Sequence, residues 1–538
     1  MRRNGAVLIG VLASAVLLGA TGCTTGAGES AEPLSTDRPG YGDPAVDALG
    51  GVTKEHLDAA LDALPDLVDE VMEKSGVPGA AVAVVFKDEV LYAEGFGERN
   101  VDTGDPVDTS TVFQIASMSK SVAATVVAHE VAEGTVTWDT PIVANMPEFA
   151  LSDPWVTEHV TIGDLFAHRS GLWEHAGDDL EDIGYDRDEV IERLRYLPLD
   201  PFRTSYAYGN FDLTTAAESV ARATGTPWED LSEEVLYGPL GMDDTSSTYA
   251  DFEANGNRAD GHMNDGEQWI VTPSQREPDP QSPAGGVSSS IDDMATWLKL
   301  LISASGPDVE PEDDIDGVLT PAALAPALVP QGAAGISRTA YQRSSFYGYG
   351  YNVGVNPGGL TTIGHSGAFA LGAGTTFQVL PDAGLGIVVL VNASPTGAAE
   401  TITADFMDLA QYGEVRQDWW ALAEQRFPIG PAPFGELVGE EPPADPAPAK
   451  ALDGYAGTYA NEYYGDAVVT VDGDALELTV GPGTIVWPLE HWDGDVFVFR
   501  PLSENTEPGS ISQATFDGDT LVIESLDAHH LGSFTRVG

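Results

Sequence analysis

The sequence predicts an α+β protein with two folded parts, and three patterns in the chain support this. Apolar residues at helical spacing alternate with short β-branched runs, and such runs lie at both ends of the first part. This order indicates that the terminal strands share one antiparallel sheet, with helices between and around them. Asp-Gly turns repeat between short strands over residues 451–538, which predicts a small all-β barrel or sandwich.

The first part of the chain, residues 53–426, reads as a single domain. Residues 56–74 carry leucine and valine at the spacing of an amphipathic helix. Residues 80–86 and 90–96 are apolar runs separated by three charged residues, which predicts a hairpin. The later elements that we expect are helices at 116–133, 190–196 and 213–224, and a strand pair at 375–380 and 385–392.

The composition changes sharply after this domain. Residues 427–450 contain seven prolines together with alanine and glutamate, which predicts a stiff, extended linker. Residues 451–538 follow as the second folded part, and they contain no lysine. We find no evident catalytic set in this second part.

The N-terminus has the pattern of an export signal. Two arginines precede an apolar run at 6–20, which is shorter than the about 20 residues that span a bilayer. The run ends in small residues before Cys23, the only cysteine of the chain, and this resembles the lipobox of bacterial lipoproteins. We therefore expect a lipoprotein signal peptide at 1–23, a flexible tether at 24–52, and export to the outer face of the cell membrane, or secretion without the lipid.

The charge of the chain excludes several classes of partner. Twenty-four basic and 85 acidic residues give a net charge of −61, and only six residues are lysine. Phosphate contacts need clustered Lys and Arg, so nucleic acid is excluded as a partner. Docking on an anionic membrane through a basic face is excluded too, which leaves the lipid on Cys23 as the expected membrane contact. Acidity spread over the whole chain suggests adaptation to high salt, where self-repulsion is screened.

Ser117 and Lys120 form the first chemical signal. They lie three residues apart at a predicted helix start, and this spacing places both side chains on one face. A serine needs a nearby base to act as a nucleophile, and a buried lysine with a lowered pKa can be that base. Ser119 points off this face and is left out. Taken alone, the pair also fits an exposed helix start with a serine cap.

Two later segments favour the catalytic interpretation. Tyr208 and Asn210 lie in a turn-like stretch before a helix, and the segment 365–368, His-Ser-Gly-Ala, precedes the late strand pair. The order Ser-x-x-Lys, Tyr-x-Asn and Lys/His-x-Gly resembles the serine β-lactamase and penicillin-binding-protein superfamily, specifically its class C β-lactamase-like branch. Further landmarks of that family are matched at 165–172, 239–245 and 284–289.

The resemblance covers residues 53–415 and implies a β-lactamase/transpeptidase-like domain, in which a helical subdomain joins the sheet and its flanking helices. The second folded part resembles, chiefly at 452–459, a small domain of unknown function that follows such hydrolase domains.

The resemblance also implies a role for each matched side chain. Ser117 would attack an acyl carbon and form an acyl-enzyme, with general-base work shared by Lys120 and Tyr208. Tyr208 would then protonate the leaving group, and Asn210 would position the substrate and the lysine. Tyr206 is not chosen, because it has no asparagine two residues on.

The third motif would bind the substrate and its oxyanion. His365 and Gly367 would contact the substrate, and the oxyanion hole would be the backbone N–H groups of Ser117 and Ala368. His365 replaces the lysine of many β-lactamases, and with Lys120 it is an expected positive group at the site.

These motifs predict a serine hydrolase that acts through an acyl-enzyme on amide or ester bonds. We expect a peptidase or amidase of the D-alanyl-D-alanine carboxypeptidase or D-aminopeptidase type, with a small-molecule or peptide substrate such as a cell-wall peptide. An esterase or a true β-lactamase of the same fold is the alternative, although His365 in place of lysine disfavours the latter. From another class, a catalytically silent lipoprotein that binds cell-wall fragments or a partner protein stays open.

Two other chemistries are disfavoured. The segment 364–368 resembles the nucleophile elbow of α/β-hydrolases, but Ala368 stands where glycine is expected and strands follow in place of a helix. No metal or cofactor is expected, because the ten histidines show no ligand spacing. His529 and His530 are expected to be a surface pair.

Overall fold

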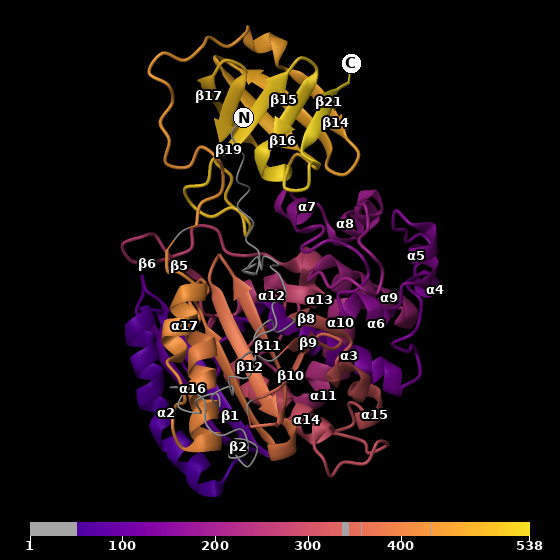
Figure 1. Ribbon diagram of the computed structural model, residues 1–538, viewed down its shortest axis with the longest axis vertical. Coiled ribbons are helices and arrows are strands. Elements are labelled where there is room, and N and C mark those ends of the chain that lie inside the picture. The colour runs from indigo at the N-terminus through magenta and orange to yellow at the C-terminus, as the bar shows by residue number, and fades with distance from the viewer. Residues whose placement is uncertain (1–50, 336–343, 357, 431, 538) are drawn as a thin grey trace, which may run out of the picture. The chain divides into compact units, whose positions relative to one another are not determined.

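The computed structural model describes residues 51–335, 344–356, 358–430 and 432–537 (Figure 1). These residues all belong to one compact unit. The predicted signal peptide, Cys23 and nearly all of the predicted tether lie outside the described ranges. Within those ranges, no helix combines the length and the apolar character that crossing a membrane requires.

A nine-stranded sheet forms the centre of the first domain. Its strands are β1 (Gly79–Phe86), β2 (Glu89–Asn100), β3 (Asp105–Pro106), β8 (Gly332–Gly335), β9 (Ser345–Tyr347), β10 (Asn352–Val355), β11 (Thr361–Phe369), β12 (Ala373–Leu380) and β13 (Leu385–Val391). Their order is β3-β2-β1-β13-β12-β11-β10-β9-β8, so early and late strands lie side by side, as predicted. In the antiparallel pair β1–β13, Val82 lies opposite Val389.

Some helices pack against this sheet, and others form a helical part of the same domain. They are α2 (Lys54–Ser75), α3 (Ser119–Ala132), α4 (Ile142–Asn145), α5 (Pro154–His159), α6 (Ile162–Phe166), α7 (Asp178–Asp182), α8 (Arg187–Arg193), α9 (Phe211–Thr224), α10 (Trp228–Ser232), α11 (Gly238–Leu240), α12 (Tyr249–Ala254), α13 (Ser282–Gly285), α14 (Ile291–Ser305), α15 (Pro321–Leu324), α16 (Ala398–Tyr412) and α17 (Trp419–Arg426). Two two-stranded sheets accompany them, β4 (Phe113–Gln114) with β7 (Ser288–Ser289) and β5 (His262–Asn264) with β6 (Trp269–Val271).

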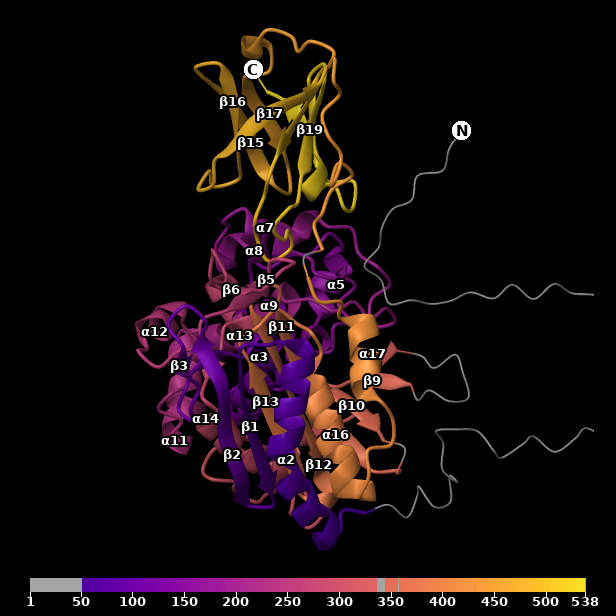
Figure 2. The same ribbon diagram turned by 90° about the vertical axis from the view of Figure 1, so that its left-hand side faces the viewer.

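Both faces of the sheet are buried, because alternate residues of a strand point to opposite faces. On one face, Val82 and Val84 pack into a core with α2 and α16, which lie side by side in Figures 1 and 2. On the other face, Ala81 and Ala83 belong to the larger core that contains α3 and α14. β1 is therefore apolar along its whole length. Its apolar sequence predicts the strand, but it does not predict which residues face which of the two cores.

The predicted helix at 116–133 is divided in two. Residues Ala116–Met118 form a 3-10 turn, and the α-helix α3 begins only at Ser119. The reason is the backbone of Ala116, because its φ of 47° is a left-handed conformation that a regular α-helix does not include.

The second folded part is a closed barrel of eight antiparallel strands. Its strands are β14 (Gly457–Asn461), β15 (Gly465–Asp472), β16 (Ala475–Val480), β17 (Trp487–Asp493), β18 (Val496–Phe499), β19 (Ser512–Asp517), β20 (Thr520–Ile523) and β21 (Ser533–Arg536). The barrel closes where Tyr459 of β14 pairs with Arg536 of β21. Gly473 and Gly518, with φ near +60°, make the tight turns that the Asp-Gly pairs predict.

The proline-rich segment before the barrel follows the barrel wall. The Ile511 N–H donates to the Phe434 carbonyl, and the Phe434 N–H donates to Ser510 Oγ, each at 2.9 Å. The Ala447 N–H donates to Asp493 Oδ1 at 2.6 Å. His529 and His530 are both exposed, as the predicted surface pair requires, although His529 also makes a contact between the domains. The His529 ring lies 4.1 Å from the ring of Trp173 in the first domain.

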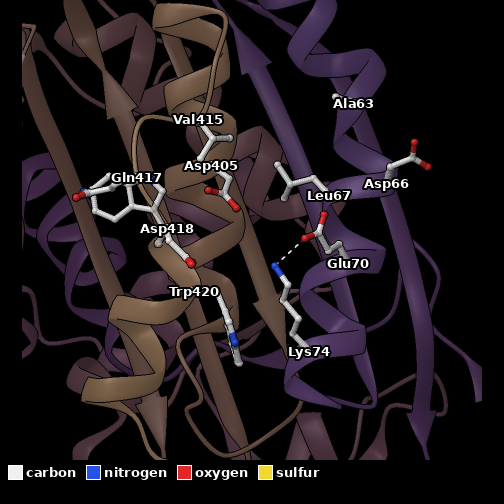
Figure 3. Close-up of a pocket in the computed structure, with 11 residues that line it drawn as sticks. Ala63, Asp66, Leu67, Glu70, Lys74, Asp405, Val415, Gln417, Asp418 and Trp420 are labelled. Carbon is white, nitrogen blue, oxygen red and sulfur yellow. Dashed lines mark ion pairs between the residues drawn. The ribbon is translucent and has the colours of Figure 1, made fainter. Parts of the chain in front are cut away.

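A cavity of about 400 Å³ lies on the α2–α16 side of the sheet (Figure 3). Lys74 forms an ion pair with Glu70 there at 2.7 Å, and burial raises the pKa of the Asp405 carboxyl to about 7. Ser117 belongs to the opposite side of the sheet, so this cavity is separate from the predicted site.

Candidate active site

Ser117 lies in the 3-10 turn that joins β4 to α3. The Ile115 N–H donates to the Val287 carbonyl at 3.0 Å, which holds the start of the turn. Ala116 then adopts its left-handed backbone, which costs a residue other than glycine on the order of 1–3 kcal/mol. This turn leaves Ser117 half-buried, whereas Lys120, one helical turn later, is fully buried.

The Lys120 amine lies among three oxygen atoms. Its Nζ is 2.6 Å from Asn210 Oδ1, 3.1 Å from the Ala284 carbonyl and 3.1 Å from Ser117 Oγ. Burial lowers the pKa of Lys120 to about 7, although the negative charges of Asp178 and Asp212 oppose the shift. A neutral amine has two N–H groups, and the two carbonyl oxygens can accept both of them. Its lone pair is then left for the hydroxyl proton of Ser117.

Tyr208 contacts both members of this pair. Lys120 Nζ lies 4.7 Å from the centre of its ring, and its hydroxyl is hydrogen-bonded to Ser117. Burial raises the pKa of Tyr208 well above its ordinary value, so the phenol keeps its proton. Tyr206, which the sequence did not favour, instead packs against the rings of His168 and Tyr347.

Asn210 connects Lys120 to a residue that sequence reasoning missed. While its Oδ1 accepts from Lys120, its Nδ2 donates to Asp178 Oδ2 at 2.8 Å. The same carboxylate oxygen lies 2.9 Å from His175 Nδ1. Asp178 precedes Asn210 by 32 residues in a loop-rich stretch, so no spacing in the sequence points to it.

His365 lies in β11, the strand directly before the predicted pair β12 and β13, and its ring is buried. Its Nδ1 is 2.7 Å from the Ser366 carbonyl, to which it must donate, and its Nε2 then accepts from the Tyr347 hydroxyl at 2.7 Å. Burial, with the nearby Lys120 charge, lowers the pKa of His365 to about 3. The expectation of a positive group at this position is therefore wrong, since both ring nitrogens are occupied in a neutral imidazole.

Gly367 lets β11 approach the Ser117 turn closely. A Cβ at this position would lie 2.3 Å from the Ile115 carbonyl oxygen and 3.0 Å from the Ser117 nitrogen, so no larger residue fits. Ala368 follows and is exposed. The structure thus brings residues 367–368 against the Ser117 turn, as an oxyanion hole from the Ser117 and Ala368 N–H groups requires.

All the residues that the three motifs predict therefore come together around Ser117. Within the part of the chain that the structure describes, no group of three or more His, Cys, Asp and Glu side chains is arranged to hold a metal ion.

The sequence matches the family model described as beta-lactamase over residues 64–412. The chain belongs to the beta-lactamase family. Residues 441–527 match a second model, described as a domain of unknown function, DUF3471, which agrees with the predicted second part. The family supports hydrolase activity for the first domain, which we call the hydrolase domain from here on.

Relatives named as a hydrolase and as a penicillin-binding protein resemble the chain at low identity. An unguisins hydrolase of Aspergillus campestris is 26% identical over 61% of this chain and 61% of its own length. Penicillin-binding protein 4 of Amycolatopsis lactamdurans is 29% identical over 73% of this chain and 96% of its own length.

A solved structure has the same fold. The octameric penicillin-binding protein homologue of Pyrococcus abyssi superposes with a TM-score of 0.57 at 21% identity, covering 86% of this chain and 98% of that one.

Proposed function

We propose that this protein is a serine peptidase or amidase that forms an acyl-enzyme on Ser117. The observation that carries the proposal is the placement of the Lys120 amine. Its two carbonyl acceptors leave the lone pair for the Ser117 hydroxyl, and its pKa near 7 makes the neutral form available at physiological pH. A purely binding protein has no need of a desolvated amine beside a serine.

In the acylation step, Ser117 Oγ attacks the substrate carbonyl carbon while its proton moves to Lys120 Nζ. The carbonyl oxygen becomes an oxyanion that the Ser117 and Ala368 N–H groups stabilise. As the intermediate collapses, the leaving amine takes the Tyr208 proton, and the Lys120 ammonium returns a proton to the phenolate. Water then attacks the acyl-enzyme, with the same groups moving protons in reverse order.

The protonated Tyr208 supports amides over esters as substrates. An amine cannot leave as an anion and must receive a proton, whereas an alkoxide leaves more easily. A phenol that keeps its proton and is hydrogen-bonded to the nucleophile is suited to this donation. For the same reason Lys120, rather than Tyr208, is the better general base.

The charges near the site support a D-aminopeptidase or amidase over a carboxypeptidase. A carboxypeptidase substrate carries a terminal carboxylate, for which a cation is the usual partner. Here His365 is neutral with both nitrogens occupied, Lys120 is buried, and Arg276 is paired with Glu181 at 2.6 Å. An amide substrate without a carboxylate fits this arrangement better.

A covalent probe tests the proposed chemistry. A fluorophosphonate and a labelled penicillin are incubated with the full chain, and the adduct is located by mass spectrometry. We expect modification of Ser117, and none in Ser117→Ala. An unmodified wild-type protein would overturn the hydrolase proposal in favour of a silent binding protein.

A substrate panel tests the finer assignment. It compares D-alanyl-p-nitroanilide, an acetylated D-alanyl-D-alanine peptide, a short p-nitrophenyl ester and a cephalosporin. We expect the highest kcat/KM among the amide substrates for the anilide, which lacks a carboxylate. Faster turnover of the acetylated dipeptide would replace the aminopeptidase assignment with the carboxypeptidase one.

We also propose that the chain is exported and carries a lipid on Cys23. The motif before Cys23 is the support for this. Metabolic labelling with a fatty-acid analogue should mark the wild-type protein in the membrane fraction but not Cys23→Ser. Unlabelled wild-type protein in the medium would point to an ordinary secretory signal.

A further inference from the structure

The barrel contacts the hydrolase domain next to Asp178, the residue that holds Asn210. Tyr463 donates its hydroxyl to Asp179 Oδ1 at 2.9 Å, and Tyr464 donates to the other oxygen. Both tyrosines come from the turn between β14 and β15. The barrel therefore anchors α7 one residue away from the carboxylate that orders Asn210 and, through it, Lys120.

A second contact lies next to the predicted oxyanion hole. Glu504, in the loop between β18 and β19, accepts the Ala370 N–H on Oε1 at 2.6 Å and the Leu371 N–H on Oε2 at 3.3 Å. These two N–H groups belong to the turn from β11 to β12, which is separated from Ala368 only by Phe369. Both oxygens of one carboxyl group accept N–H groups here, which fixes a turn better than a single acceptor would.

Arg276 connects the two contacts inside the hydrolase domain. Its guanidinium donates to Glu181 of α7 at 2.6 Å and lies 5.4 Å from the ring centre of Phe369. Its carbonyl accepts from Gln114, on the strand that leads to Ser117. The turn, α7 and the nucleophile strand thus share one buried arginine.

We propose that Glu504 is a positioning residue of the active site, so that the barrel is a working part of the enzyme rather than an appended module. It holds the turn after Ala368 and with it the direction of the Ala368 N–H. An oxyanion-hole donor must be aimed within a fraction of an ångström to stabilise the transition state, and its loss costs about 100-fold or more in kcat. If the turn loosens but stays folded, we expect kcat to fall by only part of that factor. The inference rests on the proposed acyl-enzyme chemistry.

The same loop supplies a matched control. Ser503 Oγ and Asn505 Nδ2 both donate to Asp182 Oδ2 at 2.8 Å, so they dock the loop on α7 without touching the turn. These bonds keep the loop in place when only Glu504 is changed. Asn505→Ala weakens docking but leaves the turn intact, and Asp474→Asn removes one acid at the β15–β16 hairpin, at the opposite end of these strands from the Tyr463–Tyr464 turn.

The test compares Glu504→Ala and Glu504→Gln with these two controls on one chromogenic substrate of the wild-type enzyme. We expect Glu504→Ala to lower kcat about tenfold with KM changed less than threefold, because the turn contributes to the transition state more than to binding. Glu504→Gln should lie between, since its single amide oxygen can accept one N–H. Both controls should stay within twofold. Equal kcat in Glu504→Ala and wild type, or an equal loss in Asn505→Ala, would overturn the proposal.

A second measurement separates this inference from the proposed function. Amide hydrogen exchange of the peptide that contains Ala370 and Leu371 should accelerate in Glu504→Ala but not in Asp474→Asn, whether or not the protein hydrolyses anything. Accelerated exchange in Glu504→Ala, together with a wild-type protein that forms no Ser117 adduct, would retain the contact and reject the chemistry. Unchanged exchange in Glu504→Ala, together with an active wild-type enzyme, would reject the positioning role alone.

Discussion

Two buried clusters of ionisable groups, one around Lys120 and one at the barrel interface, respond to burial in opposite ways. In the first, a single amine is surrounded by carbonyl and hydroxyl oxygens, and burial lowers its pKa to about 7. The second comprises Asp179, Glu181, Asp182, Glu504 and Arg276, and the arginine interacts with three of its four acids, Glu181, Asp182 and Glu504. There burial raises the pKa of Asp179 to about 6 and that of Glu504 to about 8.

The comparison shows that desolvation favours whichever form is neutral. At the first cluster it removes the proton from a base, and the hydroxyl of Ser117 benefits. At the second it keeps protons on acids, and a chain with 85 acidic residues can then bring several carboxyls together between two domains. One physical effect thus serves chemistry at Ser117 and assembly at the interface.

The largest expected effect is that of Lys120→Met, which tests whether the buried amine acts as the base. Methionine keeps the volume of the side chain but removes the base. We expect kcat/KM to fall by about 1,000-fold, equivalent to about 4 kcal/mol of transition-state stabilisation. Steady-state kinetics on an anilide substrate measures it. Lys299→Met in α14 is the matched control and should stay within twofold, whereas a similar loss there would indicate a general folding defect.

Asp178→Asn tests whether the negative charge of Asp178 raises the pKa of Lys120. An asparagine oxygen can still accept from Asn210, but the charge that supports the ammonium form is lost. In the wild type, kcat/KM should rise with pH through about 7 as Lys120 loses its proton. In the variant, this rise should move to lower pH by roughly one pH unit, with kcat reduced about tenfold or less. An unmoved pH profile would show that the Asp178 charge does not act on Lys120.

Asp179→Asn tests whether burial keeps a proton on an acid at the barrel interface. The folded-state pKa of Asp179 lies above its ordinary value of 3.8, so the stability it contributes is complete below about pH 4 and is lost as pH rises through about 6. Asparagine resembles the protonated form and lacks this dependence. We expect the wild-type Tm, relative to the variant, to fall by about 2 °C between pH 5 and 7.5. A constant difference over this range would mean that the carboxylate is already charged at the interface.

The last expected effect concerns salt. Screening acts on exposed charges but little on buried ones, so added KCl should stabilise the acidic surface without moving the pH profile of Lys120. We expect Tm to rise by about 2 °C or more between 0.1 and 2 M KCl. A flat or falling Tm would contradict the high-salt interpretation of the −61 charge.

The motif residues were predictable because each carries its chemistry in its residue type and spacing. Ser117 and Lys120 are one helical turn apart, and Tyr208 and Asn210 lie just before the start of α9, so local sequence already sets their geometry. The residues that were missed act through long-range contacts. Asp178 reaches Asn210 across 32 residues, and Glu504 reaches Ala370 across 134 residues. No local pattern encodes such distances.

By itself, the sequence determined the α+β class, the order of its elements, the second β part and which residues are candidates for the site, because periodicity, turn chemistry and short motifs are local properties. Only the tertiary structure decided that His365 is neutral, that Lys120 is poised to lose its proton, and that the barrel contacts the rim of the site. Those properties depend on burial and on which distant groups become neighbours, and both arise only when the chain is folded.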